Sequence, residues 1–175
     1  RVYILPTRAG LMFGVTLLLM LVGSINYNLS LGYILTFLLA GTGIVSILHT
    51  WRNLARVALR PGKSQSVFAG DHACFQVVVE NPGRLPRFSL AIALRGEPPA
   101  YFDAPACGLT EVAVSLAARR RGVLSPGRFR IFTTYPLGLF HAWANVDLDM
   151  HCLVYPAPES IPAPLPPAQS VSGEG

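Results

Sequence analysis

Three residues near the end of the chain are of the types that bind metal ions. Asp147, Asp149 and His151 alternate in the sequence, so on one strand they would present two carboxylates and an imidazole on the same face. The same residues also fit the turn of a hairpin at 147–149, with a last strand from Met150 to Tyr155. The hairpin is the simpler interpretation, and no metal ion is expected here.

No other pattern in the chain indicates chemistry. The sequence has no glycine-rich phosphate loop, nucleophile elbow, paired-cysteine motif or metalloprotease helix. His49 lacks an identifiable partner, and so do Asp71 and His72, which follow each other in the chain. We therefore expect a protein that is not an enzyme and that holds no cofactor.

The three cysteines are Cys74, Cys107 and Cys152. An odd number without metal-ligand spacing suits plain thiols in a reducing compartment. A disulfide between Cys74 and Cys152 is the alternative if the domain lies outside the cell, because both residues fall on predicted strands.

The element on which the rest of the chain depends is a long apolar stretch. From Ala9 to Trp51 there is no Asp, Glu, Lys or Arg, and a bilayer core of about 30 Å needs only about 20 helical residues. The stretch therefore predicts two membrane-spanning helices, at about residues 8–24 and 29–50. The break is predicted within Gly23–Asn28, because Gly, Ser and Asn favour a turn.

The basic residues predict the orientation of these helices. Arginines precede the first span and follow the second, whereas the connecting turn is uncharged. By the positive-inside tendency both ends face the cytoplasm. We expect a multi-pass protein of the cell inner membrane with both termini cytoplasmic. The alternatives are a buried helical hairpin in a soluble protein, which would normally show a polar face, and a cleaved signal peptide in place of the first span.

Small residues indicate how the two spans pack. They are Gly10 and Gly14 in the first span and Gly32, Thr36, Ala40 and Gly43 in the second. Small side chains allow helix backbones to approach closely in lipid, and antiparallel pairing would place Gly14 near Gly43. These residues are predicted to form the seam of the hairpin, and a homodimer seam is the alternative.

The net charge of +5 and the pI near 9.5 raise the question of a polyanionic partner. Much of the excess charge lies beside the spans, where anionic lipid is the nearest partner. The run Arg119–Arg121 is interpreted as a solvated loop, with a headgroup or partner contact as the alternative. Nucleic acid is not expected, because the aromatic residues occupy alternating core positions away from this run.

Residues 55–156 show a period of two, which predicts strands. The segments are separated by Pro and Gly turns with no helical segment between them, as in an antiparallel sandwich of immunoglobulin or fibronectin type. The fold class is therefore α+β, with a transmembrane hairpin at 1–54, a sandwich at 55–156 and a proline-rich tail or linker at 157–175. The core-facing residues are Phe75, Val77 and Val79, then Phe88, Leu90, Ile92 and Leu94, then Val112, Val114 and Leu116, then Phe129 and Ile131.

The segment from Tyr135 to Phe140 is predicted to turn a corner at the end of a strand. Pro136 cannot donate to a strand ladder, and Gly138 tolerates a bulge. Leu137, Leu139 and Phe140 are expected to fill the end of the sandwich. This corner is structural and needs no chemistry.

Several separated motifs resemble the N-terminal half of the bacterial domain-of-unknown-function family fifty-eight. The resemblance covers about residues 1 to 160. It departs at His141, where such proteins often have Arg, so the resemblance does not imply an anion contact at this corner. In chain order the motifs are Tyr3–Gly10, Ser24–Tyr27, Asn53–Leu54, Arg120–Gly122, Gly127–Phe129, Thr134–Phe140 and Val154–Pro158.

The resemblance implies a membrane anchor, a β-sandwich-like segment and a following domain similar to the von Willebrand factor A fold. Family members are often encoded beside MoxR-type ATPases and transglutaminase-like membrane proteins, which implies a role in assembly or maturation of other proteins. The chain begins with Arg1 and stops before that domain. We therefore expect a truncated product or fragment that lacks the metal-dependent adhesion site.

Two functions are compatible with this pattern. The first is a non-catalytic interaction or scaffold module held at the cytoplasmic face, whose partners are the lipid bilayer and a MoxR-type ATPase or another membrane protein. The alternative is the non-catalytic N-terminal part of a membrane enzyme or metal-dependent binding protein whose active region lies elsewhere.

Overall fold

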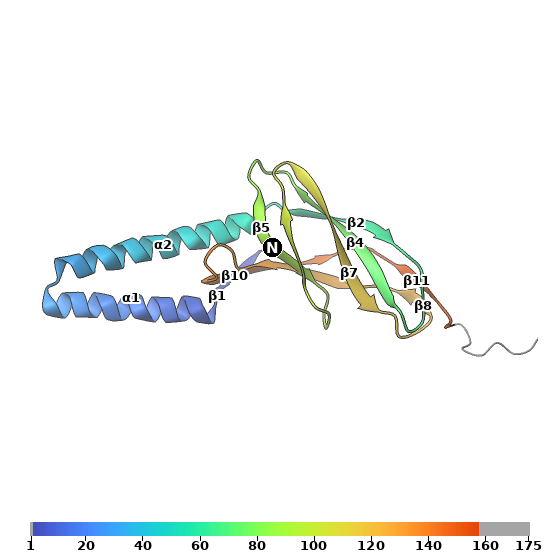
Figure 1. The fold of residues 1–175 in the computed structure, drawn as a ribbon, viewed down its shortest axis with the longest axis horizontal. Coiled ribbons are helices and arrows are strands. Elements are labelled where there is room, and N and C mark those ends of the chain that lie inside the picture. Colours follow the sequence, from blue (N-terminus) through green and yellow to red (C-terminus); the bar gives the residue numbers. More distant parts are fainter. Residues whose placement is uncertain (1, 158–175) are drawn as a thin grey trace, which may run out of the picture.

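The computed structural model describes residues 2–157 and consists of a helical hairpin joined end-on to a layered β domain (Figure 1). The helices are α1 (Arg8–Tyr27) and α2 (Ser30–Leu54). The predicted order of two apolar helices followed by antiparallel sheets is confirmed. Apart from its first residue, the predicted tail at 157–175 lies outside the described residues.

Both helices extend further than the sequence predicted. The turn lies at Asn28–Leu29, because Asn28 adopts a left-handed conformation (φ 54°) and its N–H donates to the carbonyl of Ser24, which closes α1. The other helix, α2, continues to Leu54, because Asn53 and Leu54 are buried against the sheets.

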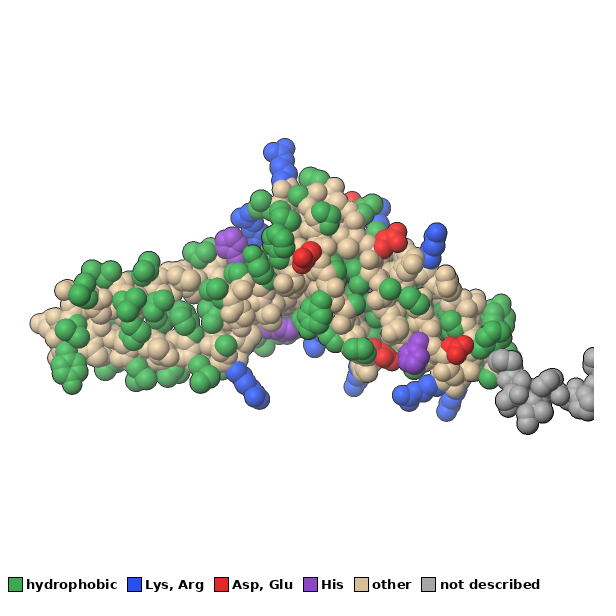
Figure 2. All heavy atoms as spheres, in the orientation of Figure 1, with side chains coloured by type: hydrophobic (Ala, Val, Ile, Leu, Met, Phe, Trp, Pro, Cys, Tyr) green, Lys and Arg blue, Asp and Glu red, His purple; other side chains and the backbone are tan. Residues whose placement is uncertain are grey.

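The surface of the hairpin is apolar and largely unburied. Figure 2 shows hydrophobic side chains along the visible side of both helices, with charged side chains gathered where the hairpin meets the sheets and beyond. Each helix is long and apolar enough to cross a membrane. This exposure does not fit a hairpin buried in the core of a soluble protein.

Eleven strands of the described chain form three sheets. The sheet orders are β1-β10-β9-β5-β6, β2-β4-β7 and β3-β11-β8, and every pairing is antiparallel except that of β3 with β11. The strands are β1 (Tyr3–Pro6), β2 (Ala58–Ser64), β3 (Val67–Phe68), β4 (His72–Asn81), β5 (Arg87–Ala93), β6 (Ala100–Ala104), β7 (Gly108–Ala117), β8 (Gly122–Leu124), β9 (Arg128–Thr133), β10 (Phe140–Asp147) and β11 (Cys152–Tyr155).

The main hydrophobic core lies between the sheets. Phe75, Val77 and Val79 of β4 are fully buried and share this core with Ile92 of β5 and Phe129 of β9. These residues have the two-residue period that the sequence predicted, so the alternation correctly identified the inward faces of their strands.

The first strand, β1, was not predicted. Tyr3 pairs with Trp143 and Pro6 pairs with Phe140. Residues 3–6 were included in the predicted hairpin region 1–54, but they form part of the five-stranded sheet. Four residues are too few to establish a period, and the partner strand lies more than a hundred residues away in the sequence.

The prediction for β5 is wrong at its first core position. Phe88 is 41% exposed, whereas the neighbouring Arg87 is buried. The register shifts between Arg87 and Leu90, where Ser89 has a left-handed backbone (φ 51°), and this bulge reverses the facing of the residues before it.

The predicted hairpin between β10 and β11 is also wrong. The two strands belong to different sheets, and β11 pairs with β3 and β8. The connecting residues Leu148 and Met150 are buried in the main core. The chain therefore crosses here from the five-stranded sheet to the β3-β11-β8 sheet and does not form a hairpin.

Candidate functional site at the junction of hairpin and sandwich

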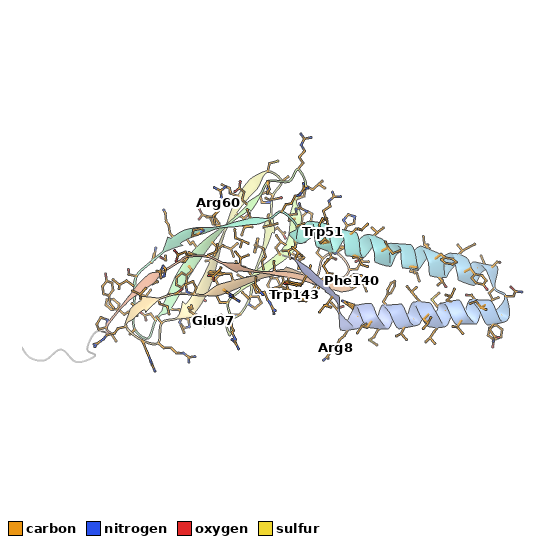
Figure 3. The ribbon with its side chains drawn as sticks, turned by 180° about the vertical axis from the view of Figure 1, so that it is seen from behind. Arg8, Trp51, Arg60, Glu97, Phe140 and Trp143 are labelled. Carbon is orange, nitrogen blue, oxygen red and sulfur yellow. The ribbon has the colours of Figure 1, made fainter. Side chains whose placement is uncertain are left out.

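The loop between β9 and β10 lies between the helix ends that face the sheets. Figure 1 shows this loop reaching the hairpin, and Figure 3 shows Phe140 between the start of α1 and the end of α2. This loop and the first residue of β10 form the predicted corner Tyr135–Phe140. The corner therefore connects the sandwich to both helices and does not simply fill the end of the sandwich.

Thr7 joins the start of α1 to this corner. Its hydroxyl donates to the carbonyl of Gly138 (2.6 Å) and accepts from the N–H of Gly10 (3.1 Å), while its own N–H donates to the carbonyl of Leu139 (2.9 Å). A threonine at this position is a common helix N-cap. Here the same side chain also fixes the helix to the loop.

Within the corner, the predicted apolar residues have different surroundings. Leu139 is buried and Phe140 is half-buried, as expected for residues that fill a joint. Leu137 is 53% exposed, so the expectation that it fills the sandwich is wrong. Pro136 and Gly138 lie in the turn itself, where Gly138 has φ 69°.

On the other helix, Thr50 and Asn53 bind the same region. The hydroxyl of Thr50 donates to the carbonyl of Tyr135 (2.9 Å). The amide of Asn53 donates to the carbonyl of Phe88 (2.7 Å) and to the hydroxyl of Thr133 (3.1 Å), and its oxygen accepts from the N–H of Phe88 (3.2 Å). Asn53 therefore joins α2 to β5 and β9 at once.

Arg87 closes the end of α2. This residue is 8% exposed, and its guanidinium donates to the carbonyl of Arg52 in the last turn and to the side-chain oxygen of Asn81 (3.4 Å). A cation at a helix C-terminus donates hydrogen bonds to free carbonyls and is attracted to the negative end of the helix dipole. Burial, followed by the nearby charge of Arg52, lowers the pKa of Arg87 from its usual value.

Gly10, a predicted seam residue, lies against the backbone of the corner. A Cβ at this position would overlap the carbonyl oxygen of Leu139. Glycine is therefore required here so that the first turn of α1 can lie against the loop backbone.

The remaining seam residues only partly match the prediction. Gly32 lies against Ser24, and Gly43 lies against the ring of Phe13, 3.3 Å from where its Cβ would be. A Cβ on Gly14 would meet no atom within 4 Å, whereas its neighbour Phe13 contacts Gly43, so the proximity of Gly14 and Gly43 stays a prediction. Of the two other seam residues on α2, Thr36 is buried and Ala40 is half-buried.

A second feature is a row of aromatic rings on the outer face of the five-stranded sheet. Tyr3, Trp143 and Phe132 occupy paired positions on β1, β10 and β9, and Ala91 separates Phe132 from Tyr101 on the far edge. Because Ala91 is small, the ring of Tyr101 reaches that of Phe132 with centroids 6.5 Å apart. The rings of Tyr3 and Trp143 stack at 5.8 Å.

His141 and Arg130 belong to the same face. The imidazole lies between Phe132 and Trp143, with centroids 5.3 Å and 5.4 Å away. Burial, followed by the charge of Arg130, lowers the pKa of His141 below its usual value, so it is neutral near pH 7. The guanidinium of Arg130 lies 5.8 Å from the Trp143 ring.

A hollow of about 530 Å³ adjoins this row, and its lining includes Arg95, Arg128, Arg130, Phe132 and Asn145. Arginines and aromatic rings therefore do meet on this face, which sequence reasoning missed because the residues come from separate strands. The absence of a nucleic-acid partner stays a prediction.

The other candidates from the sequence lie apart from the junction. The side chains of Asp149 and His151 are exposed and 3.5 Å apart, and the described residues hold no group of three His, Cys, Asp or Glu side chains placed to bind a metal ion. Arg119–Arg121 form an exposed loop before β8. Cys152 is buried while Cys74 is exposed, and both are free thiols, so the disulfide alternative is wrong.

The comparisons with known proteins show a distant likeness only. No family model matches this sequence, and no curated protein matches it. Among solved structures, a CARDB domain of a protein from Pyrococcus furiosus, crystallised in complex with di-metal ions, is similar over 57% of this chain and 94% of that domain, with 13% identity and a TM-score of 0.32.

Proposed function

We propose that the protein is a non-catalytic interaction module anchored in the inner membrane by its hairpin, with both termini and the sandwich in the cytoplasm. The observation that carries this proposal is the joint at the corner. Hydrogen bonds from Thr7, Thr50 and Asn53 hold one loop region against both helices. Such a joint would fix the height and angle of the sandwich relative to the bilayer, so that an interaction module holds its binding surface in one position for a partner.

Two further features support the membrane part of the proposal. The exposed apolar surface of the helices needs a covering, and a lipid bilayer covers two helices of this length and composition. Arginines flank the hairpin on the sandwich side, which by the positive-inside tendency favours the cytoplasm.

The outer face of the five-stranded sheet is the surface that we assign to a partner protein. Tyr3 and Tyr101 remain exposed at the two ends of the aromatic row, and Arg130 lies beside it. Exposed aromatic residues and arginine are the side chains most enriched at the centres of protein interfaces. The resemblance to family fifty-eight, whose members are often encoded beside MoxR-type ATPases, suggests a MoxR-type ATPase as the first partner to test, with an immunoglobulin- or fibronectin-like sandwich as the module that binds it.

Affinity capture tests this assignment. The full chain, extracted in mild detergent, is used as bait, and bound proteins are identified by mass spectrometry. We expect a MoxR-type ATPase or another membrane protein to be recovered by the wild type and lost in the Y101S/R130Q double variant. The control is R60Q, because Arg60 forms an ion pair with Glu80 (2.7 Å) on the β2-β4-β7 sheet.

Either of two results would overturn the proposal. One is that no partner is recovered reproducibly from the native membrane. The other is that Y101S/R130Q retains the partner as well as R60Q does, which would move the interface to another surface.

A further inference from the structure

Four arginines from two separate parts of the chain surround one hollow beside the end of α2. Its volume is about 320 Å³. Arg52 and Arg56 come from the end of α2 and the residues after it, and Arg84 and Arg87 come from the connection between β4 and β5 and the start of β5. Trp51 and Leu85 complete the apolar part of the lining, and they are 50% and 47% exposed.

The described residues that line this hollow supply no counter-charge. No Asp or Glu is among the described residues that line it. The buried guanidinium of Arg87 has only neutral acceptors, the oxygens of Asn81 and Arg52. Positive groups gathered without a counter-charge repel each other, so a bound anion would stabilise the arrangement.

The helix contacts give the height of this hollow relative to a bilayer. Gly43 faces Phe13, and Gly32 faces Ser24, which sets an antiparallel register with residue 48 level with Arg8. Arg8 is the charged residue that begins α1 and so marks the edge of the apolar surface. Arg52 lies four residues beyond residue 48, or about 6 Å along the axis.

A headgroup layer occupies about 5 to 7 Å on each side of the hydrocarbon core. With the edge of the hydrocarbon core at Arg8, Arg52 would lie at the depth of the lipid phosphates. Figure 3 shows Arg8 and Trp51 at the same end of the hairpin, and tryptophan prefers this interfacial depth.

We propose that this hollow binds the phosphate of an anionic phospholipid, with Arg52, Arg56 and Arg84 as its accessible contacts. The inference depends on the membrane anchoring proposed above. Trp51 and Leu85 lie against the glycerol and upper acyl region. A choline headgroup would bring a further cation beside the arginines, so the site prefers phosphatidylglycerol to phosphatidylcholine.

Native mass spectrometry of the full chain in detergent tests this preference. The probes are phosphatidylglycerol and phosphatidylcholine with identical acyl chains, added separately. We expect the wild type to retain one phosphatidylglycerol molecule in preference to phosphatidylcholine. Replacing two solvent-accessible arginines in R56Q/R84Q is expected to weaken this preference by about three- to tenfold. Both residues are exposed, so circular dichroism should show an unchanged fold.

The matched control is R119Q/R120Q, which removes the same charge from the exposed loop before β8 and should leave retention unchanged. Equal retention of both lipids, or an equal loss in the two double variants, would overturn the site. Complete displacement of the lipid by inorganic phosphate would also overturn it and would indicate a site for the free ion. Extraction of the chain from native membranes by alkaline washing would instead contradict the anchoring itself.

Discussion

Gly10 and Gly14 lie one helical turn apart in α1, yet their surroundings differ. The position of a Cβ on Gly10 is occupied by the carbonyl of Leu139, whereas a Cβ on Gly14 would meet no atom. The two glycines are equivalent in a small-residue pattern, and only the position of the corner distinguishes them.

The substitution G10A is expected to destabilise the junction by about 1 to 3 kcal/mol, because the added methyl group overpacks a site bounded by backbone. G14A is the control and should be neutral or stabilising by up to about 1 kcal/mol, since alanine favours a helix over glycine. Thermal unfolding of both variants in the same detergent measures the difference. Equal shifts in the two variants would contradict the close contact of Gly10 with the corner.

At the scale of elements, the end of α2 connects the hairpin to the sandwich. Asn53 binds both the N–H and the carbonyl of Phe88, and these backbone groups lie where the bulge at Ser89 interrupts the sheet ladder. The bulge therefore exposes the backbone groups of β5 that the helix then satisfies.

Removing this connection should be costly. N53A would leave the part-buried N–H and carbonyl of Phe88 without their side-chain partner, and we expect a loss of roughly 1 to 3 kcal/mol in unfolding free energy. The control is T42A, because the hydroxyl of Thr42 is exposed and bonds only within α2, to Leu38 (3.0 Å). Chemical unfolding followed by circular dichroism compares the two. If N53A lowers the unfolding free energy no more than T42A does, the hydrogen bonds of Asn53 do not stabilise the junction.

The elements also differ in how well the sequence predicted them. Strands β4, β7 and β9 have clear alternation, and their inward residues were identified correctly. Strand β1 and the crossing of the chain between β10 and β11 were missed, because both depend on pairing with distant strands. Local periodicity reports which face of a strand is apolar but not which strand lies beside it.

At the scale of the whole molecule, the proposed orientation makes a prediction about thiol accessibility. Cys74 and Cys107 are exposed and Cys152 is buried. We expect an impermeant maleimide to leave Cys74 and Cys107 unlabelled in intact cells and to label both after lysis. Cys152 should stay unlabelled while the chain is folded.

The turn between the helices provides the matched control. The variant N26C, made in a C74S/C107S background, should be labelled without lysis, because Asn26 is exposed close to the end of α1 that lies away from the sheets. Labelling of Cys74 or Cys107 in intact cells, with none at position 26, would show that the orientation is inverted.

The sequence alone determined that two apolar helices precede a β-rich domain, because hydropathy and alternation are properties of neighbouring residues. It also predicted that the segment Tyr135–Phe140 forms a corner, from the chemistry of its Pro and Gly. Only the tertiary structure placed that corner between the helix ends, and only it brought Arg52 and Arg56 beside Arg84 and Arg87. These arrangements depend on contacts between residues that are distant in the chain, which the order of residue types along the sequence does not specify.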